Sequence, residues 1–338
     1  MSLETALQRR WYGQPGALLS LLPLEGLYRA LSSLRRHAYA QGWRRAWRAP
    51  VPVLVVGNIS VGGTGKTPVV IALCQALRRA GLRPGIVSRG YGARPPQLPF
   101  DVRADGQVAE CGDEPLLLAR RSGAPVVIAP DRAAAARHLL DKHDCNVIVS
   151  DDGLQHYALA RDIECVVVDA ARGFGNGHCL PVGPLREPLS RLRSVDAVLC
   201  NETAGSGADV VAMAGAYAFE LQATALVPLA GGAEQGVDNW PAERRRVHAV
   251  AGIGNPQRFF ATLRQLGFEP VEHVFPDHHP FSAADFQFAE ALPVVMTEKD
   301  AVKCSAFADE RLWYLAVETR LPDSLLAVIM GKLSAFAW

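Results

Sequence analysis

A glycine-rich loop at residues 57–70, GNISVGGTGKTPVV, constrains the fold of this chain more than any other feature of its sequence. The apolar run VPVLVVGN overlaps its start, and a helical pattern follows it. A buried strand, a glycine-rich turn and a helix are typical of a phosphate-binding loop, where backbone amides and the helix N-terminus surround phosphate oxygens. We expect Lys66 to reach the β- and γ-phosphates of a nucleotide and the Thr67 hydroxyl to ligate Mg²⁺. The predicted nucleotide site comprises Ser60, Val61, Gly62, Gly63, Thr64, Gly65, Lys66 and Thr67.

Ser60 stands where the GxxxxGK[ST] pattern has its first glycine. The amides nearest the phosphates belong to residues 62–67, and Gly57 still eases the turn upstream, so we interpret the substitution as tolerable. Val61 disfavours the dimeric ATPases that carry a second, signature lysine at this position. A glycine-rich turn without a ligand is the alternative, and the strand–loop–helix context argues against it.

From residue 51 onward, short apolar runs alternate with helical patterns. This alternation predicts an α/β fold of the P-loop NTPase type, with a mostly parallel sheet flanked by helices. We predict an N-terminal amphipathic helix region at 1–48, a core domain at 49–205, a Gly- and Ala-rich linker at 206–245, and a smaller α/β domain at 246–338 that closes over a cleft. Within the smaller domain, SAADFQFAEAL is predicted to be a helix.

Bulk composition excludes several classes of protein. The formal net charge of +1 argues against a general nucleic-acid binder, which needs a basic surface. Seven scattered cysteines without a CxxC pair do not form a disulfide framework or a zinc knuckle, and they are typical of a reduced, cytosolic protein. No apolar run approaches the ~20 residues needed to span a bilayer.

The segment before residue 49 concentrates basic charge, with eight arginines against Glu4 and Glu25. Its leucines recur near a helical period, at positions 18, 19, 21, 22, 24, 27, 31 and 34. Such a basic amphipathic helix can lie in a membrane interface. Two alternatives remain: a helix packed on the globular body, and a signal peptide, which the arginines around the supposed cleavage site disfavour.

Carboxylates follow a second apolar strand, in VIVSDDGLQH. A strand that ends at Asp151 and Asp152 places carboxylates beside the phosphate-binding loop, as a Walker B element does. Gln155 and His156 follow and could face the same crevice. The alternative is a pair of solvated aspartates that begin a turn.

Two further segments carry candidate acid–base groups. Asp113 and Glu114 open a helix in CGDEP, where acidic residues are ordinary capping groups. Phosphoryl transfer to a hydroxyl nevertheless needs one carboxylate to accept the proton and others to hold metal. In FPDHHPF, His278 could hydrogen-bond a catalytic carboxylate across the cleft, and a surface loop is the alternative.

Arginines in glycine- and proline-rich surroundings are candidates for binding anions. Arg186 in GPLREP is the strongest of these, and Arg132 and Arg137 are candidates in the core domain. We expect Arg191 and Arg193 to belong to a generic basic surface rather than to a site that binds anions. The segment TEKDAVK, with Lys299 and Asp300, is only faintly similar to a guanine-reading NKxD motif and carries no assignment.

Taken together, SVGGTGKTP, SRGYG, GDEP, DDGLQH, LPVGPLREP, FPDHHPF and TEKDAVK, in this order, resemble the tetraacyldisaccharide 4'-kinase family of lipid A biosynthesis. The resemblance runs from about residue 10 to near the C-terminus, and Ser60 matches the loop of that family. It implies transfer of the γ-phosphate of ATP to the 4'-hydroxyl of a tetraacylated glucosamine disaccharide 1-phosphate. It also implies an enzyme on the cytoplasmic face of the bacterial inner membrane, docked there by its N-terminal helix, with no nucleic-acid or protein partner.

The same resemblance implies roles for individual residues. Asp113 becomes the base, assisted by His278. Glu114, Asp151 and Asp152 become carboxylates that organise Mg²⁺ or the nucleotide. Arg132 and Arg186 become cations that face phosphate, and the positions that line the site are Tyr91, Gln155 and His156. The choices between Asp151 and Asp152 as the direct Mg²⁺ ligand, and between His278 and His279 as the partner of the base, stay open. The alternative functions are a nucleotide-switch ATPase acting on a protein and a P-loop kinase or ligase of a soluble metabolite.

Overall fold

The computed structural model of the protein describes residues 7, 10–13, 16–201 and 215–336. Thirteen strands of these residues form one continuous sheet, in the order β11-β10-β12-β13-β8-β7-β6-β1-β5-β2-β4-β3, with β9 paired to β8. The strands are β1 Val53–Gly57, β2 Pro84–Ser88, β3 Phe100–Val102, β4 Val126–Ile128, β5 Val147–Asp151, β6 Ile163–Asp169, β7 Ala197–Asn201, β8 Tyr217–Pro228, β9 Gln235–Gly236, β10 Arg246–Ala251, β11 Glu269–Val274, β12 Val294–Thr297 and β13 Leu312–Arg320.

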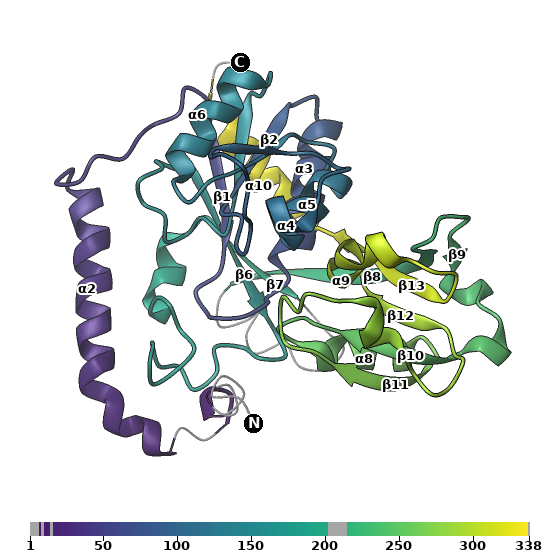
Figure 1. Ribbon diagram of the computed structural model, residues 1–338. Coiled ribbons are helices and arrows are strands. Elements are labelled where there is room, and N and C mark those ends of the chain that lie inside the picture. The colour runs from purple at the N-terminus through teal and green to yellow at the C-terminus, as the bar shows by residue number, and fades with distance from the viewer. Residues whose placement is uncertain (1–6, 8–9, 14–15, 202–214, 337–338) are drawn as a thin grey trace.

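Helices flank this sheet (Figure 1). The α-helices are α2 Leu22–Ala40, α3 Lys66–Arg79, α4 Val108–Cys111, α5 Asp113–Arg121, α6 Arg132–Lys142, α8 Pro256–Gln265, α9 Glu298–Cys304 and α10 Asp323–Leu333. The 3₁₀ helices are η1 Gly16–Leu21, η2 Leu189–Ser194, η3 Val237–Asn239, η4 Ala242–Arg244, η5 Ala283–Phe286 and η6 Ser305–Phe307. The predicted mostly parallel α/β fold is confirmed.

Strand β1 lies at the centre of the larger half of the molecule, which comprises β1–β7. It pairs in parallel with β5 on one side and β6 on the other, so that Val56 lies opposite both Asp151 and Cys165. Leu54 and Val56 pack on the face covered by α3, α5 and α10, whereas Val53 and Val55 pack on the face covered by α6. A strand buried on both faces needs a continuous apolar run, which explains VLVVG.

Strand β8 joins the larger half to the smaller half, β10–β13. Its first residues, 217–219, pair in parallel with β7, and residues 220–228 pair antiparallel with β13. The segment that the sequence assigns to a linker therefore carries the longest of the described strands; residues 206–214 of that segment lie outside the described residues. The sequence does not predict β8, because its buried and exposed residues alternate irregularly as the strand passes from one half to the other.

The C-terminal helix α10 returns to the larger half. Leu325, Ile329 and Leu333 are buried in the same apolar cluster as Leu73 of α3. The two halves thus share a core as well as a sheet.

The predicted helix at 282–292 is wrong. The structure has only the short η5, closed by a capping box between Ser282 and Asp285. Phe286 and Phe288 both turn toward the protein, where Phe286 contacts Phe281 and Phe288 stacks on His273. Residues two apart do not share a face of an α-helix, so this aromatic packing is incompatible with the predicted helix.

Helix α2 lies along the outer edge of the molecule (Figure 1). It turns polar groups inward: Tyr28 donates to the Arg186 carbonyl (2.8 Å), and the buried Glu25 carboxylate accepts from the Cys179 amide (2.8 Å). Its leucines face away from the protein, with exposed fractions of 53–58% at Leu24, Leu27, Leu31 and Leu34. No helix of the described residues is long and apolar enough to span a bilayer.

The contrast between buried and exposed leucines gives a stability test. We expect Leu325→Ala to lower the free energy of unfolding by about 3 kcal/mol, because it leaves a cavity in the shared core. The control, Leu31→Ala, removes a side chain that is already exposed and should leave stability nearly unchanged. Urea denaturation followed by tryptophan fluorescence measures both, and equal effects of the two substitutions would show that α10 does not anchor the larger half.

Candidate active site

The phosphate-binding loop connects β1 to α3, and its backbone explains where glycine is needed. Gly62 has φ +105° and Gly65 has φ +87°, values that favour glycine. Among the described residues other than glycine, only Asp152 and His278 have positive φ. Ser60 is therefore in an ordinary conformation; it is buried and forms a β-bridge with Leu185. The structure explains why serine replaces the first glycine without strain.

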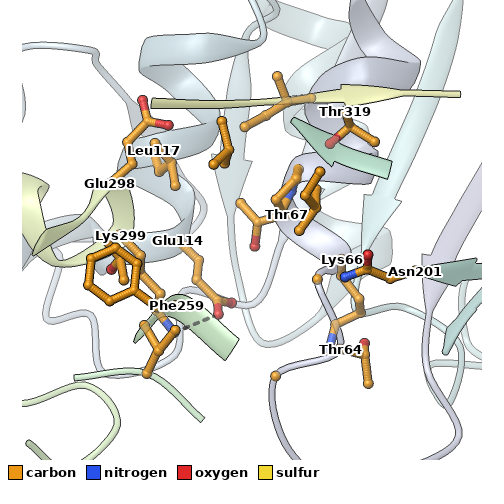
Figure 2. A pocket seen from close by; sticks show the side chains of 18 of the residues that line it. Thr64, Lys66, Thr67, Glu114, Leu117, Asn201, Phe259, Glu298, Lys299 and Thr319 are labelled. Carbon is orange, nitrogen blue, oxygen red and sulfur yellow. Dashed lines mark hydrogen bonds and ion pairs between the residues drawn. The ribbon is translucent and has the colours of Figure 1, made fainter. Parts of the chain in front are cut away.

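A cavity of about 380 Å³ lies between this loop and the smaller half. Thr64, Lys66 and Thr67 line it on one side, and Phe259 of α8 and Lys299 of α9 line it on the other, while Thr319 of β13 lies near Thr67 (Figure 2). Three buried polar atoms at its edge, Thr64 Oγ1, Asn201 Nδ2 and Arg258 Nη1, have no hydrogen-bond partner within the described part of the chain. All three atoms can donate a hydrogen bond, and a ligand that carries phosphate oxygens would accept from them, so these residues fit a nucleotide.

Asp151 and Asp152 follow each other at the end of β5 and have different surroundings. Asp151 is buried and accepts from Ser88 Oγ (2.9 Å), while its Oδ1 lacks a partner among the described residues. Burial, together with the nearby charges of Glu114 and Asp152, raises the pKa of Asp151 to about 7. A carboxylate that is costly to ionise in this way is stabilised by a nearby cation, which fits a metal site.

Asp152 instead faces cations of the larger half. Its carboxylate lies 3.4 Å from Lys66 Nζ and 3.2 Å from Arg186 Nη1. Although burial opposes it, the charges of Lys66 and Arg186 hold the pKa of Asp152 below its usual value. Its φ of +46° is a backbone conformation that residues other than glycine rarely adopt. The predicted residues Lys66, Asp152 and Arg186 therefore form one cluster at the phosphate-binding loop.

Asp113 and His278 meet across the two halves. Asp113 is the first residue of α5, and His278 lies in the loop between β11 and η5. His278 Nδ1 donates to Oδ2 (2.9 Å) and lies 3.1 Å from Oδ1. The Tyr91 ring lies 5.1 Å from the imidazole ring of His278. Of the two histidines in FPDHHPF, His278 is the one that contacts Asp113, whereas His279 lies 3.4 Å from Asp285.

The charges around this pair keep it ionised. Burial opposes ionisation of Asp113, but the hydrogen bond from His278 and the charges of Lys299 and Lys303 hold the pKa of Asp113 below its usual value. The hydrogen bond to Asp113 raises the pKa of His278. Asp113 is thus an unprotonated carboxylate whose geometry is set by an imidazole.

Lys299 is a site residue that sequence reasoning missed. Its Nζ lies 2.9 Å from Glu114, 3.2 Å from Asp277 and 3.9 Å from Asp113, and the dashed line in Figure 2 marks the first of these contacts. The carboxylates around it raise the pKa of Lys299 despite its burial. The available signal was the spacing of Lys299 and Lys303 in TEKDAVK, which places two lysines on one face of a helix.

Arg132, Gln155 and His156 lie behind the carboxylates. Arg132 is buried, donates to the Ala129 carbonyl (2.9 Å) and leaves Nε without a partner among the described residues. Its amide donates to His156 Nε2 (3.2 Å). Gln155 donates to Glu187 (2.8 Å) and to the Asn58 carbonyl (3.1 Å), so it braces the start of the phosphate-binding loop. The generic basic surface predicted for Arg191 is wrong, because Arg191 is buried and pairs with Glu164 (2.6 Å).

Some of the predicted site residues line the cavity, and others lie outside its lining. Glu114, Asp277 and Lys299 line the cavity, whereas Asp113, His278, Asp151, Asp152 and Arg186 do not. Lys66 and Glu114 connect the two regions, because Lys66 contacts Asp152 and Glu114 contacts Lys299. The arrangement places an ionised carboxylate, cations and a phosphate-binding loop side by side, which suits phosphoryl transfer.

The Asp113–His278 contact predicts the titration of one histidine. We expect the pKa of His278 in the native protein to lie above 6.5. In the Asp113→Asn variant this pKa should be lower, because the attractive charge is lost while burial and the charge of Lys299 still oppose protonation of His278. The shift is measured by titrating the NMR signals of the histidines. The signal of His278 is identified as the one that is missing from the spectrum of the His278→Gln variant. Asp101→Asn, far from this pair and beside His138 and His143, serves as the control and should not move the His278 signal.

Comparisons with known proteins agree with this architecture. The family model for tetraacyldisaccharide-1-P 4'-kinase (LpxK) matches residues 17–334. The tetraacyldisaccharide 4'-kinases of Azotobacter vinelandii and of Pseudomonas aeruginosa strain LESB58 are each 54% identical to this chain over 318 residues, covering 94% of this chain and 93% and 94% of theirs. The solved structure of LpxK from Aquifex aeolicus in complex with ATP is similar with a TM-score of 0.74 and 29% identity, covering 94% of this chain and 99% of that one. The resemblance seen in the sequence is confirmed: the chain belongs to the tetraacyldisaccharide-1-P 4'-kinase family.

Proposed function

We propose that this chain is an ATP-dependent lipid kinase that phosphorylates the 4'-hydroxyl of a tetraacyldisaccharide 1-phosphate in lipid A biosynthesis. Membership of the family supports the reaction, and the ATP complex of the Aquifex aeolicus relative supports the phosphate donor. The observation that carries the proposal is the hydrogen bond between Asp113 and His278 beside the phosphate-binding loop. The match to relatives over 94% of the chain disfavours the switch ATPase and the soluble-metabolite kinase.

In this proposal Asp113 is the base. Its carboxylate takes the proton from the acceptor hydroxyl while the hydroxyl oxygen forms a bond to the γ-phosphorus. The bond between that phosphorus and the bridging oxygen of the β-phosphate breaks, and ADP leaves with the electron pair. His278 orients Asp113 and offsets the charge of the carboxylate before transfer.

Cations around the phosphates stabilise the charge that develops during transfer. Lys66 and Arg186 flank Asp152 at the loop and are placed to neutralise phosphate oxygens. Tyr91 beside His278, and Arg132, Gln155 and His156 behind the carboxylates, are assigned to position this cluster.

The residues that would hold Mg²⁺ are Thr67 and one or two carboxylates from the set Glu114, Asp151 and Asp152. The unpartnered Oδ1 of Asp151 fits such a cation. Within the described ranges no three His, Cys, Asp or Glu side chains converge as a complete metal cage, which agrees with Mg²⁺, since this ion is usually held by one or two carboxylates and substrate phosphates. When bound, Mg²⁺ supplies charge neutralisation at the β- and γ-phosphates.

Helix α2 is assigned to the membrane surface. Its leucines face away from the body, which argues against a helix that packs on the protein by its apolar face. Glu25 and Tyr28 attach the opposite face to the loop that carries Arg186, so the helix is linked directly to the phosphate-binding cluster. This arrangement would bring the site to the cytoplasmic face of the bacterial inner membrane, where the acyl chains of the acceptor lie.

The reaction is tested with γ-labelled ATP, Mg²⁺ and the tetraacyldisaccharide 1-phosphate in detergent micelles. We expect label to appear in the lipid with the native protein. With Asp113→Asn we expect turnover to fall by about 10²–10⁴-fold while ATP binding persists, because the variant loses only the proton acceptor. Asp105→Asn, which changes an exposed aspartate paired with Arg103, is the matched control.

Two results of this assay would contradict the proposal. ATP consumed without labelled lipid would reject the acceptor, and full activity of Asp113→Asn would reject the base.

Membrane association is tested by substituting exposed leucines. Leu27, Leu31 and Leu34 changed together to Gln should lower partitioning onto anionic lipid vesicles by about a hundredfold, because the apolar face of the helix is lost. The control is Leu98→Gln with Val274→Gln, two other exposed apolar positions. Sedimentation with vesicles measures both, and equal partitioning of the leucine variant and the native protein would rule out α2 as the anchor.

A further inference from the structure

Arg258 reaches from the smaller half to the phosphate-binding loop. It lies in the first turn of α8, and it lines the same cavity as Lys66 and Thr67. A methyl group placed on Gly65 would lie 3.9 Å from both Nη1 and Nη2 of Arg258. The guanidinium therefore sits directly against the backbone that the loop offers to phosphate.

This guanidinium has no anionic partner at hydrogen-bond distance. The Arg258 side chain is 18% exposed, and its Nη1 is buried without a hydrogen bond among the described residues. The carboxylate facing it, Asp169 Oδ2, is 3.7 Å away and already accepts from Asn255 Nδ2 at 3.1 Å. Asp169 Oδ1 accepts from the Ala171 amide at 3.1 Å.

A second cation lies close to Arg258. A second guanidinium, Arg172, lies against Gly62 and donates to the Gly254 carbonyl (2.5 Å). Burial lowers the pKa of Arg258, Asp169 offsets this effect in part, and the charge of Arg172 adds to the lowering. Because Arg258 has no carboxylate within hydrogen-bond distance, an anion bound in the cavity would compensate its charge.

The phosphate-binding loop follows β1 and has neighbouring strands on two sides, and Arg258 lies on only one of these sides. Asp151 and Asp152 end β5, on one side of β1, whereas Asp169 ends β6 and Asn201 ends β7, on the other side. In the proposed function, the transferred phosphate lies on the β5 side, where Lys66 and Arg186 pair with Asp152. The part of the nucleotide that stays behind then extends past Gly65 toward Asn201 and Arg258, whose unpartnered donors face this region.

From this geometry we infer that Arg258 binds the diphosphate of the nucleotide that remains after transfer, and that the smaller half thereby takes part in nucleotide binding. The inference rests on the proposed function. Asn201 Nδ2, which a methyl group on Gly65 would approach to 3.7 Å, is the second donor of this subsite.

Contact between the halves holds Arg258 in place. A methyl group on Gly254 would lie 2.9 Å from the Gly63 amide nitrogen, so the loop before α8 packs tightly on the phosphate-binding loop. The Gly252 amide donates to the buried Asp300 (2.9 Å), which anchors that loop to α9. Movement of the smaller half away from the larger half would withdraw Arg258 from the cavity, so nucleotide binding and contact between the halves are coupled.

The test is direct calorimetric titration of the full chain with MgADP and with MgATP, without acceptor. We expect Arg258→Met to raise the Kd for both nucleotides by about tenfold to a hundredfold, because a charge-assisted hydrogen bond is lost. Arg258→Lys keeps the charge but loses the forked donors, and its Kd should rise less. The matched control is Arg264→Met, on the same helix, where Arg264 pairs with Glu272 at the surface and the Kd should stay within about twofold.

The outcomes separate this inference from the proposed function. Failure of the native protein to bind either nucleotide would reject the kinase proposal and the subsite with it. Native binding together with unchanged Kd values for both Arg258 variants would overturn the subsite and leave the kinase proposal standing. Loss of MgATP binding with MgADP binding retained would also overturn it, because Arg258 would then contact the transferred phosphate. If thermal denaturation shows that Arg258→Met does not fold, Arg258→Lys decides: a Kd equal to the native value overturns the subsite.

Discussion

The double pairing of β8 is the constraint on which the rest of this structure depends. One strand adds in parallel to β7 and then antiparallel to β13, so the two halves become parts of one sheet rather than separate bodies on a flexible tether. Because α10 also returns to the core of the larger half, the smaller half is held at both of its ends. Arg258 of α8 and the loop before it can therefore approach the phosphate-binding loop to within a few ångströms.

The site built on this frame balances carboxylates and cations that come from both halves. Asp113 and Glu114 begin α5 in the larger half, and His278 and Lys299 reach them from the smaller half. Lys66 and Arg186 surround Asp152 on the other side of the cluster. Asp151 makes no ion pair within the described part of the chain; burial raises its pKa, and its Oδ1 has no hydrogen-bond partner there.

The family to which the chain belongs is named for a kinase of a tetraacylated disaccharide, and we propose that α2 holds such an acceptor near this cluster. Tyr28 of α2 donates to the Arg186 carbonyl, so the helix that carries the exposed leucines is attached to the arginine that pairs with Asp152. An acceptor held with its acyl chains at α2 would have its sugars near the larger half, where Asp113 and Arg186 lie.

The sequence by itself determined the phosphate-binding loop, the parallel core and the identity of Asp113, Asp151, Asp152 and His278 as candidates, because these depend on local patterns of glycine, apolar runs and strand ends. It also carried a family resemblance that the comparisons confirm. It missed β8 and the role of Lys299, and it predicted a helix at 282–292 that aromatic packing replaces. Only the tertiary structure decided that His278 rather than His279 contacts Asp113, that Arg258 faces Gly65, and that the α2 leucines point outward. Each of these depends on distances between segments far apart in the chain, which no local pattern specifies.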